Sequence, residues 1–304
     1  MLPSTEVLHP KPSTLPAIST VPDLSEEDLV ALAEAVRELE HMSFALHLAN
    51  LLGRQIGQVG KLVPPSVTGL VNRAAEAAIK NAFHLALRSL GPQNQDEFNK
   101  GTLKGTRRFH KAAVVLSGAA GGAFGIASLP VELPISTMLI LRSIADIARH
   151  EGEDLSEPDT LLACLQVFAL GSREDGGGDF TESGYFATRG LFAKSVSEAA
   201  RYLVGRAATD EASPVLVRFL AQIGARFGVV VSQKLAAQAV PVLGAAGGAA
   251  VNYAFLTHFQ RIAHGHFTIR RLERIYGREP VHAEYERLAR GERRSAWNNA
   301  PSGA

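Results

Sequence analysis

The sequence predicts an all-α fold, and two observations carry that prediction. From residue 25 onward, apolar residues recur every three or four positions, the spacing that gathers them on one face of a helix. Alternating strand patterns are nearly absent, and the run VVV at 229–231 lies inside a helical pattern. We expect a single multi-helix domain with two Gly/Ala-rich helices that pack closely.

The first helix is predicted to begin at Ser25. The Ser25 hydroxyl can accept a hydrogen bond from a free backbone N–H, and the Asp28 carboxylate can return the contact, which makes a capping box. Pro64 and Pro65 break the helical pattern, since each removes a backbone donor. The apolar stripe of this first helix consists of Leu29, Leu32, Val36 and Leu39.

The later helices are delimited by prolines near their starts and glycines at their ends. Pro158 suits the first turn of a helix, and Gly91 followed by Pro92 suits the end of another. The predicted ranges are 67–91, 135–152, 157–171, 185–208 and 214–240, followed by a helix through IAHGHFTIRRLERIYG at 262–277.

The domain is predicted to cover residues 24–290. Residues 1–23 are rich in Pro, Ser and Thr and lack a basic start followed by an apolar stretch, so we expect a disordered lead-in that is not a secretion signal. Residues 291–304 are polar, and we expect a flexible tail there.

Two runs of small residues raise the question of a membrane. The first small-residue run (112–131) and the second (240–255) contain glycines spaced four apart, such as Gly118 with Gly122 and Gly244 with Gly248. That spacing lets helix backbones approach closely. The first run is just long enough for a membrane span, and the second lies in a stretch between Lys234 and Arg261 that has no charged residue and is also long enough. Ala and Gly, however, favour insertion only weakly. We favour buried helices over a membrane-inserted helical hairpin.

The composition excludes some classes of protein. The chain carries 31 basic and 30 acidic residues, a net charge of +1, which argues against nonspecific binding of nucleic acid. Cys164 is the one cysteine, so an intramolecular disulfide and a multi-cysteine metal site are both excluded. We expect a cytoplasmic protein, either free or peripheral at the inner membrane.

Several segments, in their order along the chain, resemble the EcsC protein family of bacteria. They are SGAAGGAFGIASLPVELPISTMLILRSIADIARHEGEDL, GYFATRGLFAKSVSEAA and VSQKLAAQAVPVLGAAGGAAVNYAFLTHFQRIAHGHFTIRRLERIYG. Glu151 departs from the family pattern, which has an aromatic residue before the glycine. The positions that match the pattern are Gly118, Gly122, Gly125, Pro130, Pro134, Leu141, Arg142, Tyr185, Arg189, Pro241, Gly244 and Asn252.

The resemblance implies a cytoplasmic or membrane-associated accessory protein, linked by gene context to an ABC transporter and to secretion. Some relatives carry a peptidase label, but this chain contains no HExxH, GxSxG or phosphate-binding GxxxxGK[ST] motif. Cys164 has apolar neighbours and is interpreted as a core thiol. His258, His264 and His266 do not share a helix face, so we expect no metal and no cofactor.

Six polar residues lie in or beside apolar segments and form the candidate ligand-binding set. We favour a structural role in which they pair with each other or cap helices, since buried polar groups need partners. The alternative is a pocket between the Gly-rich helices, where Arg142 and Arg189 would hold an anionic group. The set is Glu132, Arg142, Asp146, Tyr185, Arg189 and Asn252.

The C-terminal segment suggests contact with lipid. Its apolar residues Phe267, Ile269, Leu272 and Ile275 stand beside arginines, a pattern that can rest on an anionic membrane surface. We therefore expect a non-enzymatic accessory protein that contacts lipid or a membrane transport complex. A hydrolase that uses a polar pocket around Glu132 and Arg142 is the alternative. The arginines concerned are Arg270, Arg271, Arg274, Arg278, Arg287, Arg290, Arg293 and Arg294.

Overall fold

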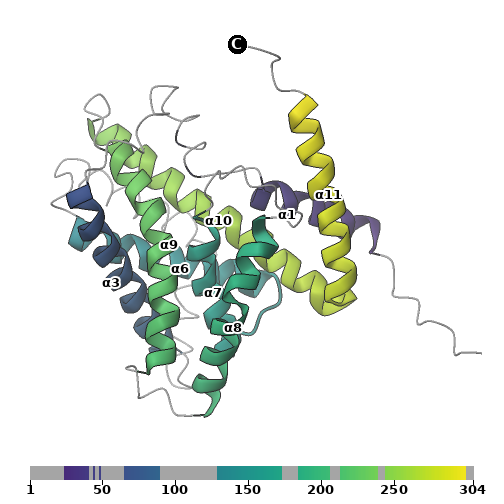
Figure 1. The fold of residues 1–304 in the computed structure, drawn as a ribbon, viewed down its shortest axis with the longest axis horizontal. Helices are drawn as coiled ribbons and strands as arrows, with labels where there is room; N and C mark the ends of the chain where they lie inside the picture. The colour runs from purple at the N-terminus through teal and green to yellow at the C-terminus, as the bar shows by residue number, and fades with distance from the viewer. Residues whose placement is uncertain are drawn as a thin grey trace, which may run out of the picture.

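The computed structural model describes residues 24–40, 44, 48, 65–89, 129–172, 184–205, 213–238 and 244–298. Within these ranges the secondary structure is helical without strands, which confirms the all-α prediction. The helices are α1 (Glu26–Glu40), α3 (Pro65–Ser89), α6 (Leu129–His150), α7 (Pro158–Leu170), α8 (Gly184–Gly205), α9 (Pro214–Gln238), α10 (Gly244–Tyr276) and α11 (Arg278–Asn298) (Figure 1).

Three helix boundaries differ from the prediction. α6 begins at Leu129, because Pro130 lies in the first turn, where its missing N–H is not needed, and Pro134 is accommodated inside the helix. The second small-residue run does not form a separate element; from Gly244 it continues without a break into the helix that ends at Tyr276. The predicted start of the flexible tail at residue 291 falls inside α11.

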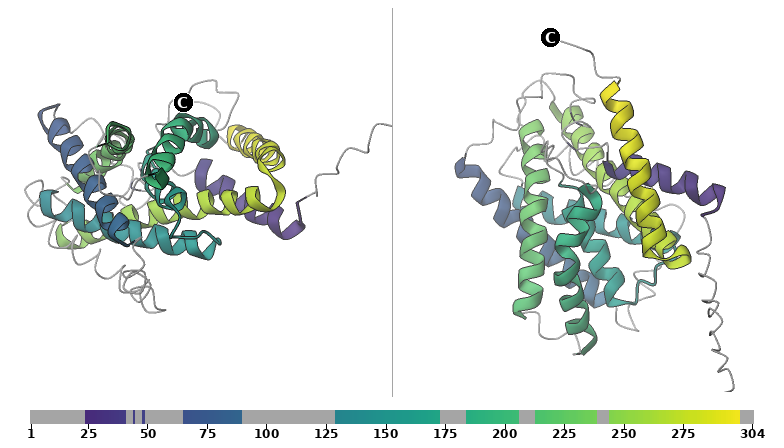
Figure 2. Two further views of the ribbon diagram at one scale, coloured as in Figure 1. Left: turned by 90° about the horizontal axis from the view of Figure 1, so that it is seen from below. Right: turned by 45° about the vertical axis from the view of Figure 1, so that its right-hand side comes forward.

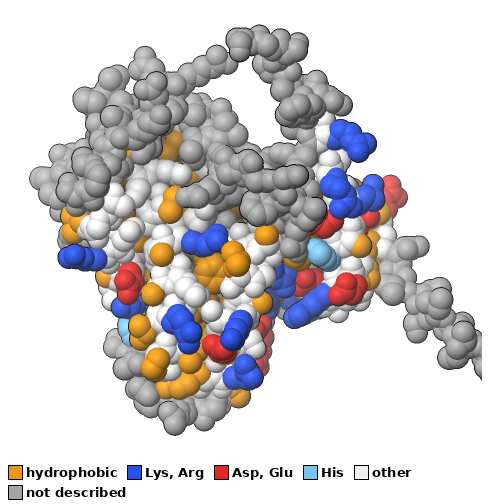
Figure 3. Space-filling view, viewed as in Figure 1, with side chains coloured by type: hydrophobic (Ala, Val, Ile, Leu, Met, Phe, Trp, Pro, Cys, Tyr) orange, Lys and Arg blue, Asp and Glu red, His pale blue; other side chains and the backbone are white. Residues whose placement is uncertain are grey.

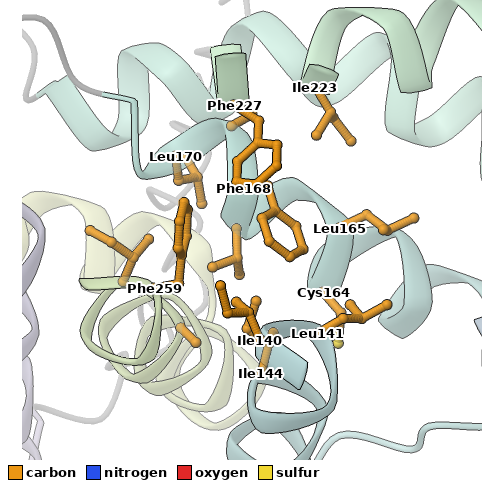
Figure 4. Packing of buried hydrophobic residues seen from close by; sticks show 14 of the residues in the cluster. Ile140, Leu141, Ile144, Cys164, Leu165, Phe168, Leu170, Ile223, Phe227 and Phe259 are labelled. Carbon is orange, nitrogen blue, oxygen red and sulfur yellow. The ribbon is translucent and has the colours of Figure 1, made fainter. Parts of the chain in front are cut away.

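The core is built around α7. Every residue of α7 from Thr160 to Leu170 is buried, and the helix packs against α6, α8, α9 and α10. The Phe168 ring lies 5.0 Å from that of Phe227 in α9 and 5.2 Å from that of Phe259 in α10, so the three rings gather in one group (Figure 4). This group joins α7 to the consecutive helices α9 and α10.

α10 extends beyond this core and carries the rest of the domain. It contacts α6, α7 and α9, and it also contacts α1 and α11, which pack against one another. Figure 2 shows α1 and α11 together at one side of the molecule, with α8 lying between α11 and α9. The first and last described helices are therefore assembled on one long central helix.

Glycines in α9 and α10 allow close contacts between helices. A Cβ at Gly224 of α9 would lie 3.0 Å from the Cα of Glu76 in α3, and one at Gly265 of α10 would lie 2.8 Å from Leu39 in α1. Residues 112–128 of the first small-residue run, with Gly118, lie outside the described residues. In the second run, Gly248 is buried.

The predicted capping box is present, with a third participant. The Ser25 hydroxyl oxygen accepts a hydrogen bond from the N–H of Asp28 at 3.2 Å. The N–H of Ser25 donates to the hydroxyl of Tyr276 at 3.3 Å, and that hydroxyl donates to the Asp28 carboxylate at 2.7 Å. The start of α1 is thereby fixed to the end of α10. Gly277 follows with φ +87°, a conformation suited to glycine at the turn into α11.

One helix within the described ranges, α9, is long and apolar enough to cross a membrane. Half of its most apolar stretch is buried inside the fold. In the second small-residue run and the residues after it, Val251, Phe255 and Phe259 are fully buried. Contact with a membrane must therefore be considered for α9 as well as for the two small-residue runs.

We predict that Gly224→Leu lowers the free energy of unfolding by about 3 kcal/mol, because the added side chain meets the backbone of α3, which cannot rotate away. The matched control is Gly69→Leu in α3, where a Cβ meets nothing within 4 Å. That control is expected to raise stability by up to ~1 kcal/mol, since glycine is a poor helix former. Urea unfolding of both variants tests the prediction, and equal midpoints would contradict it.

Candidate functional site

Two of the six predicted residues come together at the start of α8. The hydroxyl of Tyr185 lies 2.8 Å from Nδ1 of His266 in α10. Arg189, one turn further along α8, makes two hydrogen bonds to the Glu273 carboxylate at 2.8 and 2.7 Å and a longer one to the Tyr185 hydroxyl at 3.4 Å. This paired geometry fits a guanidinium and a carboxylate edge to edge, which makes the contact specific as well as strong.

Two more side chains bring α1 and α11 to the same place. Oε1 of Glu40, the last residue of α1, accepts hydrogen bonds from the N–H of Tyr185 at 3.2 Å and from the hydroxyl of Tyr285 in α11 at 2.9 Å. A carboxylate suits the positive end of the α8 dipole. We call this cluster the polar junction; its members are Glu40, Tyr185, Arg189, His266, Glu273 and Tyr285.

The electrostatics of the polar junction keep its central pair neutral. Burial raises the pKa of Tyr185 to about 12 and lowers the pKa of His266 well below its ordinary value. The Tyr185 oxygen accepts a hydrogen bond from Arg189, so the Tyr185 hydroxyl can donate its proton to Nδ1 of His266. The neutral imidazole then carries its own proton on Nε2. That Nε2 atom is buried and has no hydrogen-bond partner among the described residues.

Glu132 lies in a different cluster, between α6 and α9. Its Oε1 accepts a hydrogen bond from Nζ of Lys234 at 2.7 Å, and both side chains are almost completely buried. The ammonium also lies 4.7 Å from the ring centre of Phe255 in α10. Burial lowers the pKa of Lys234, although the Glu132 carboxylate opposes that change. The sequence around Lys234 does not indicate this pair, because its partner, Glu132, is distant in the sequence.

The remaining three predicted residues do not join the polar junction. Asn252 is fully buried in α10, one turn from Phe255 and about 21 Å along the helix from His266 at 1.5 Å per residue. Arg142 is exposed on α6, and Asp146, one turn further, is partly buried. The six residues are therefore distributed over at least two places.

A third cluster lies where α6 ends, and it changes the interpretation of the C-terminal arginines. The Glu153 carboxylate is hydrogen-bonded to Arg270 at 2.8 and 3.0 Å and also to Arg274. Arg271 binds Glu151 and Asp28, each at 2.9 Å. These arginines hold the α6–α7 connection and α1 against α10. In the sequence, the acidic stretch HEGED at 150–154 contains two of their partners, Glu151 and Glu153.

The predicted lipid-facing stripe of this segment is wrong for three of its four apolar residues. Phe267, Ile269 and Leu272 are fully buried, because they form the face of α10 that packs inside the fold. Ile275 is exposed.

The three histidines have separate hydrogen-bond partners, and the cysteine is buried. Nε2 of His258 lies 2.8 Å from the carbonyl oxygen of Gly171, and Nδ1 of His264 lies 2.7 Å from the Glu38 carboxylate, so His258, His264 and His266 each face a different partner. No group of three or more potential metal ligands gathers in the described ranges. Cys164 is buried, and burial raises the pKa of its thiol.

Comparison with known proteins gives one result. The model of the EcsC protein family matches residues 33–272, well over half of the chain. No curated protein and no solved structure matches it.

We predict that Glu273→Gln lowers the free energy of unfolding by about 2 kcal/mol, because it leaves the partly buried Arg189 guanidinium without its counter-charge. The matched control is Glu284→Gln, which breaks an exposed pair with Arg287 and should cost less than about 1 kcal/mol. Thermal or urea unfolding measures both. Equal losses would show that the polar junction does not hold α8 to α10.

We also predict that acid unfolding depends on Glu153. Burial opposes ionisation of this carboxyl, but Arg270 and Arg274 outweigh it and hold the pKa below its usual range. The resulting stability is complete above about pH 5 and is lost as the pH falls through the folded-state pKa. In urea titrations from neutral to acid pH, Glu153→Gln should be less stable at pH 7 and show a flatter decline. The exposed Glu279→Gln is the control, and a Glu153→Gln curve parallel to the wild-type curve would refute the prediction.

Proposed function

We propose that this chain, which belongs to the EcsC protein family, acts without chemistry of its own as an accessory protein that contacts lipid at the cytoplasmic face of a membrane. A membrane transport complex is the physiological partner that the family resemblance suggests. The near balance of acidic and basic residues continues to argue against a nucleic-acid partner.

The observation that supports this proposal most directly is the position of α9. The helix contains no Asp or Glu and has the length and apolarity of a membrane span, yet half of its most apolar stretch remains outside the protein core. Val217 is the large apolar side chain of α9 that is exposed, and such a side chain gains free energy by contact with a bilayer.

Contacts in the middle and near the end of α9 favour peripheral contact over insertion. Lys234 is paired with Glu132, and moving that pair into lipid would expose two charges to hydrocarbon. Gly224, nearer the start of α9, lies directly against the backbone of α3. A helix fixed in this way can present a surface to lipid without leaving the domain.

The hydrolase alternative lacks an activated nucleophile in the described part of the chain. Covalent catalysis needs a nucleophile whose pKa is lowered or whose proton is taken by a neighbouring base. Burial instead raises the pKa of Cys164 and of Tyr185. Arg189 is occupied by Glu273, and Glu132 by Lys234. These contacts favour a structural role for the predicted polar residues.

We predict that the expressed protein sediments with membranes and is released by high salt, because peripheral contact with anionic lipid is screened by salt. Fractionation with successive salt and alkaline carbonate washes measures this. Retention through carbonate would favour the membrane-inserted hairpin, and complete absence from the pellet would contradict contact with lipid.

A further inference from the structure

α8 and α9 form an antiparallel pair on the surface of the domain. The Ser195 hydroxyl of α8 donates a hydrogen bond to Oε1 of Gln222 in α9 at 2.9 Å, and the Arg226 guanidinium lies 5.7 Å from the ring centre of Phe192. Because residue numbers rise along one helix as they fall along the other, the end of α8 lies beside the start of α9. The outer sides of both helices are exposed together.

Large apolar side chains project from this pair into water. Leu191 is 68% exposed and Val204 is 75% exposed, both on α8, and Val217 on α9 is 39% exposed. Val204 and Val217 lie at the same end of the antiparallel pair. Single exposed apolar residues are common on proteins, so the surrounding charges decide what this surface is suited to contact.

The charges of α8 and α9 are strongly asymmetric. Glu198 is the one acidic residue in the two helices. Two of their six basic residues, Arg189 and Lys234, are paired with carboxylates of other helices. The four that remain for the surface are Lys194, Arg201, Arg218 and Arg226.

Glu198 neutralises little of this positive charge. Its contact with Lys194 spans 3.9 Å, and the Lys194 side chain is 88% exposed, so the pair is weak and open to solvent. Figure 3 shows basic and apolar side chains interspersed over the lower part of the face that α8 and α9 occupy in Figure 1.

From this combination we infer that the outer side of α8 and α9 docks on an anionic lipid bilayer. The inference rests on the proposed function and adds the site and the lipid class. The exposed aliphatic side chains enter the headgroup region, while the long basic side chains reach phosphates around them. The basic residues are spread along both helices, and an anionic bilayer supplies negative charge over that whole length. We call this set the α8–α9 surface; it consists of Leu191, Lys194, Arg201, Val204, Val217, Arg218 and Arg226.

α11 is the rival surface, and its described residues fit lipid less well. Arg287 and Arg290 are both well exposed, but carboxylates of the same helix, Glu284 and Glu286, accompany them. No large apolar side chain is exposed on α11 among the residues whose burial is described. It therefore offers charge without an apolar group to insert.

The test is co-sedimentation of the full chain with vesicles of phosphatidylcholine alone or mixed with phosphatidylglycerol. We expect binding to the anionic vesicles only, reduced by salt. Lys194→Gln combined with Arg201→Gln should weaken that binding about 25-fold, since each basic residue contributes about fivefold. The matched control, Arg287→Gln combined with Arg290→Gln, should bind like wild type.

A second pair of variants tests the apolar part. Leu191→Gln should reduce binding to anionic vesicles several-fold, whereas Val30→Gln, at an equally exposed position on α1 (62% exposed), should not. All six substituted positions are exposed, so folding is expected to persist, and thermal unfolding checks it.

The outcomes separate the inference from the proposed function. If wild type binds no vesicle, contact with lipid itself fails, and an acidic protein becomes the occupant to test. If wild type binds but the Lys194/Arg201 and Leu191 variants bind equally well, the proposed function stands and the α8–α9 surface is wrong. A loss confined to the Arg287/Arg290 variant would assign the contact to α11. Equal binding to both vesicle types would overturn the role of charge.

Discussion

A charge that lies inside this helical domain needs an opposite charge from another helix, and the arrangement of the helices follows from that requirement. Lys234 of α9 meets Glu132 of α6, Arg189 of α8 meets Glu273 of α10, and Arg270 of α10 meets Glu153 after α6. Removing either partner would leave a charge in surroundings that cannot solvate it. Apolar packing around Phe168 holds the centre together, and the ion pairs join α6 to α9, α8 to α10 and the α6–α7 connection to α10.

α10 makes polar contacts with several other segments in addition to its apolar packing. His264 faces α1, His266 faces α8, and Arg271 reaches both α1 and the turn after α6. The hydrogen bond of Glu38 raises the pKa of His264, although burial opposes it. One continuous helix thus connects segments from both ends of the described chain, and the domain cannot be divided between its N-terminal and C-terminal helices.

The helices were predictable from the sequence because their signals are local. The Ser25–Asp28 cap and the start of α7 at Pro158 depend on neighbours within one turn of helix. The contacts that join helices were not predictable in the same way: Arg270 and Glu153 are 117 positions apart, and nothing near Arg270 distinguishes it from a solvated arginine. Glycines spaced four apart do indicate close helix packing. That spacing occurs in α9 at Gly224 and Gly228 as well as in the two small-residue runs. Tyr185 and Arg189 could be singled out because they are polar residues in an apolar segment and match the family pattern, whereas Glu40, His266 and Glu273 reach them only through tertiary structure.

The surplus of basic residues on α8 and α9 also affects how the molecule is oriented before it contacts a membrane. These two helices carry a formal charge of +5, of which +3 remains once Arg189 and Lys234 are paired with Glu273 and Glu132; since the whole chain carries +1, the rest of the chain carries −2. A nearly neutral protein with its charges separated in this way is an electric dipole. Near a negatively charged plane it experiences a torque that turns the α8–α9 surface forward, over a range of about 8 Å at physiological salt. The chain would then arrive already oriented, and the rate of productive encounters would depend on ionic strength more steeply than a net charge of +1 suggests.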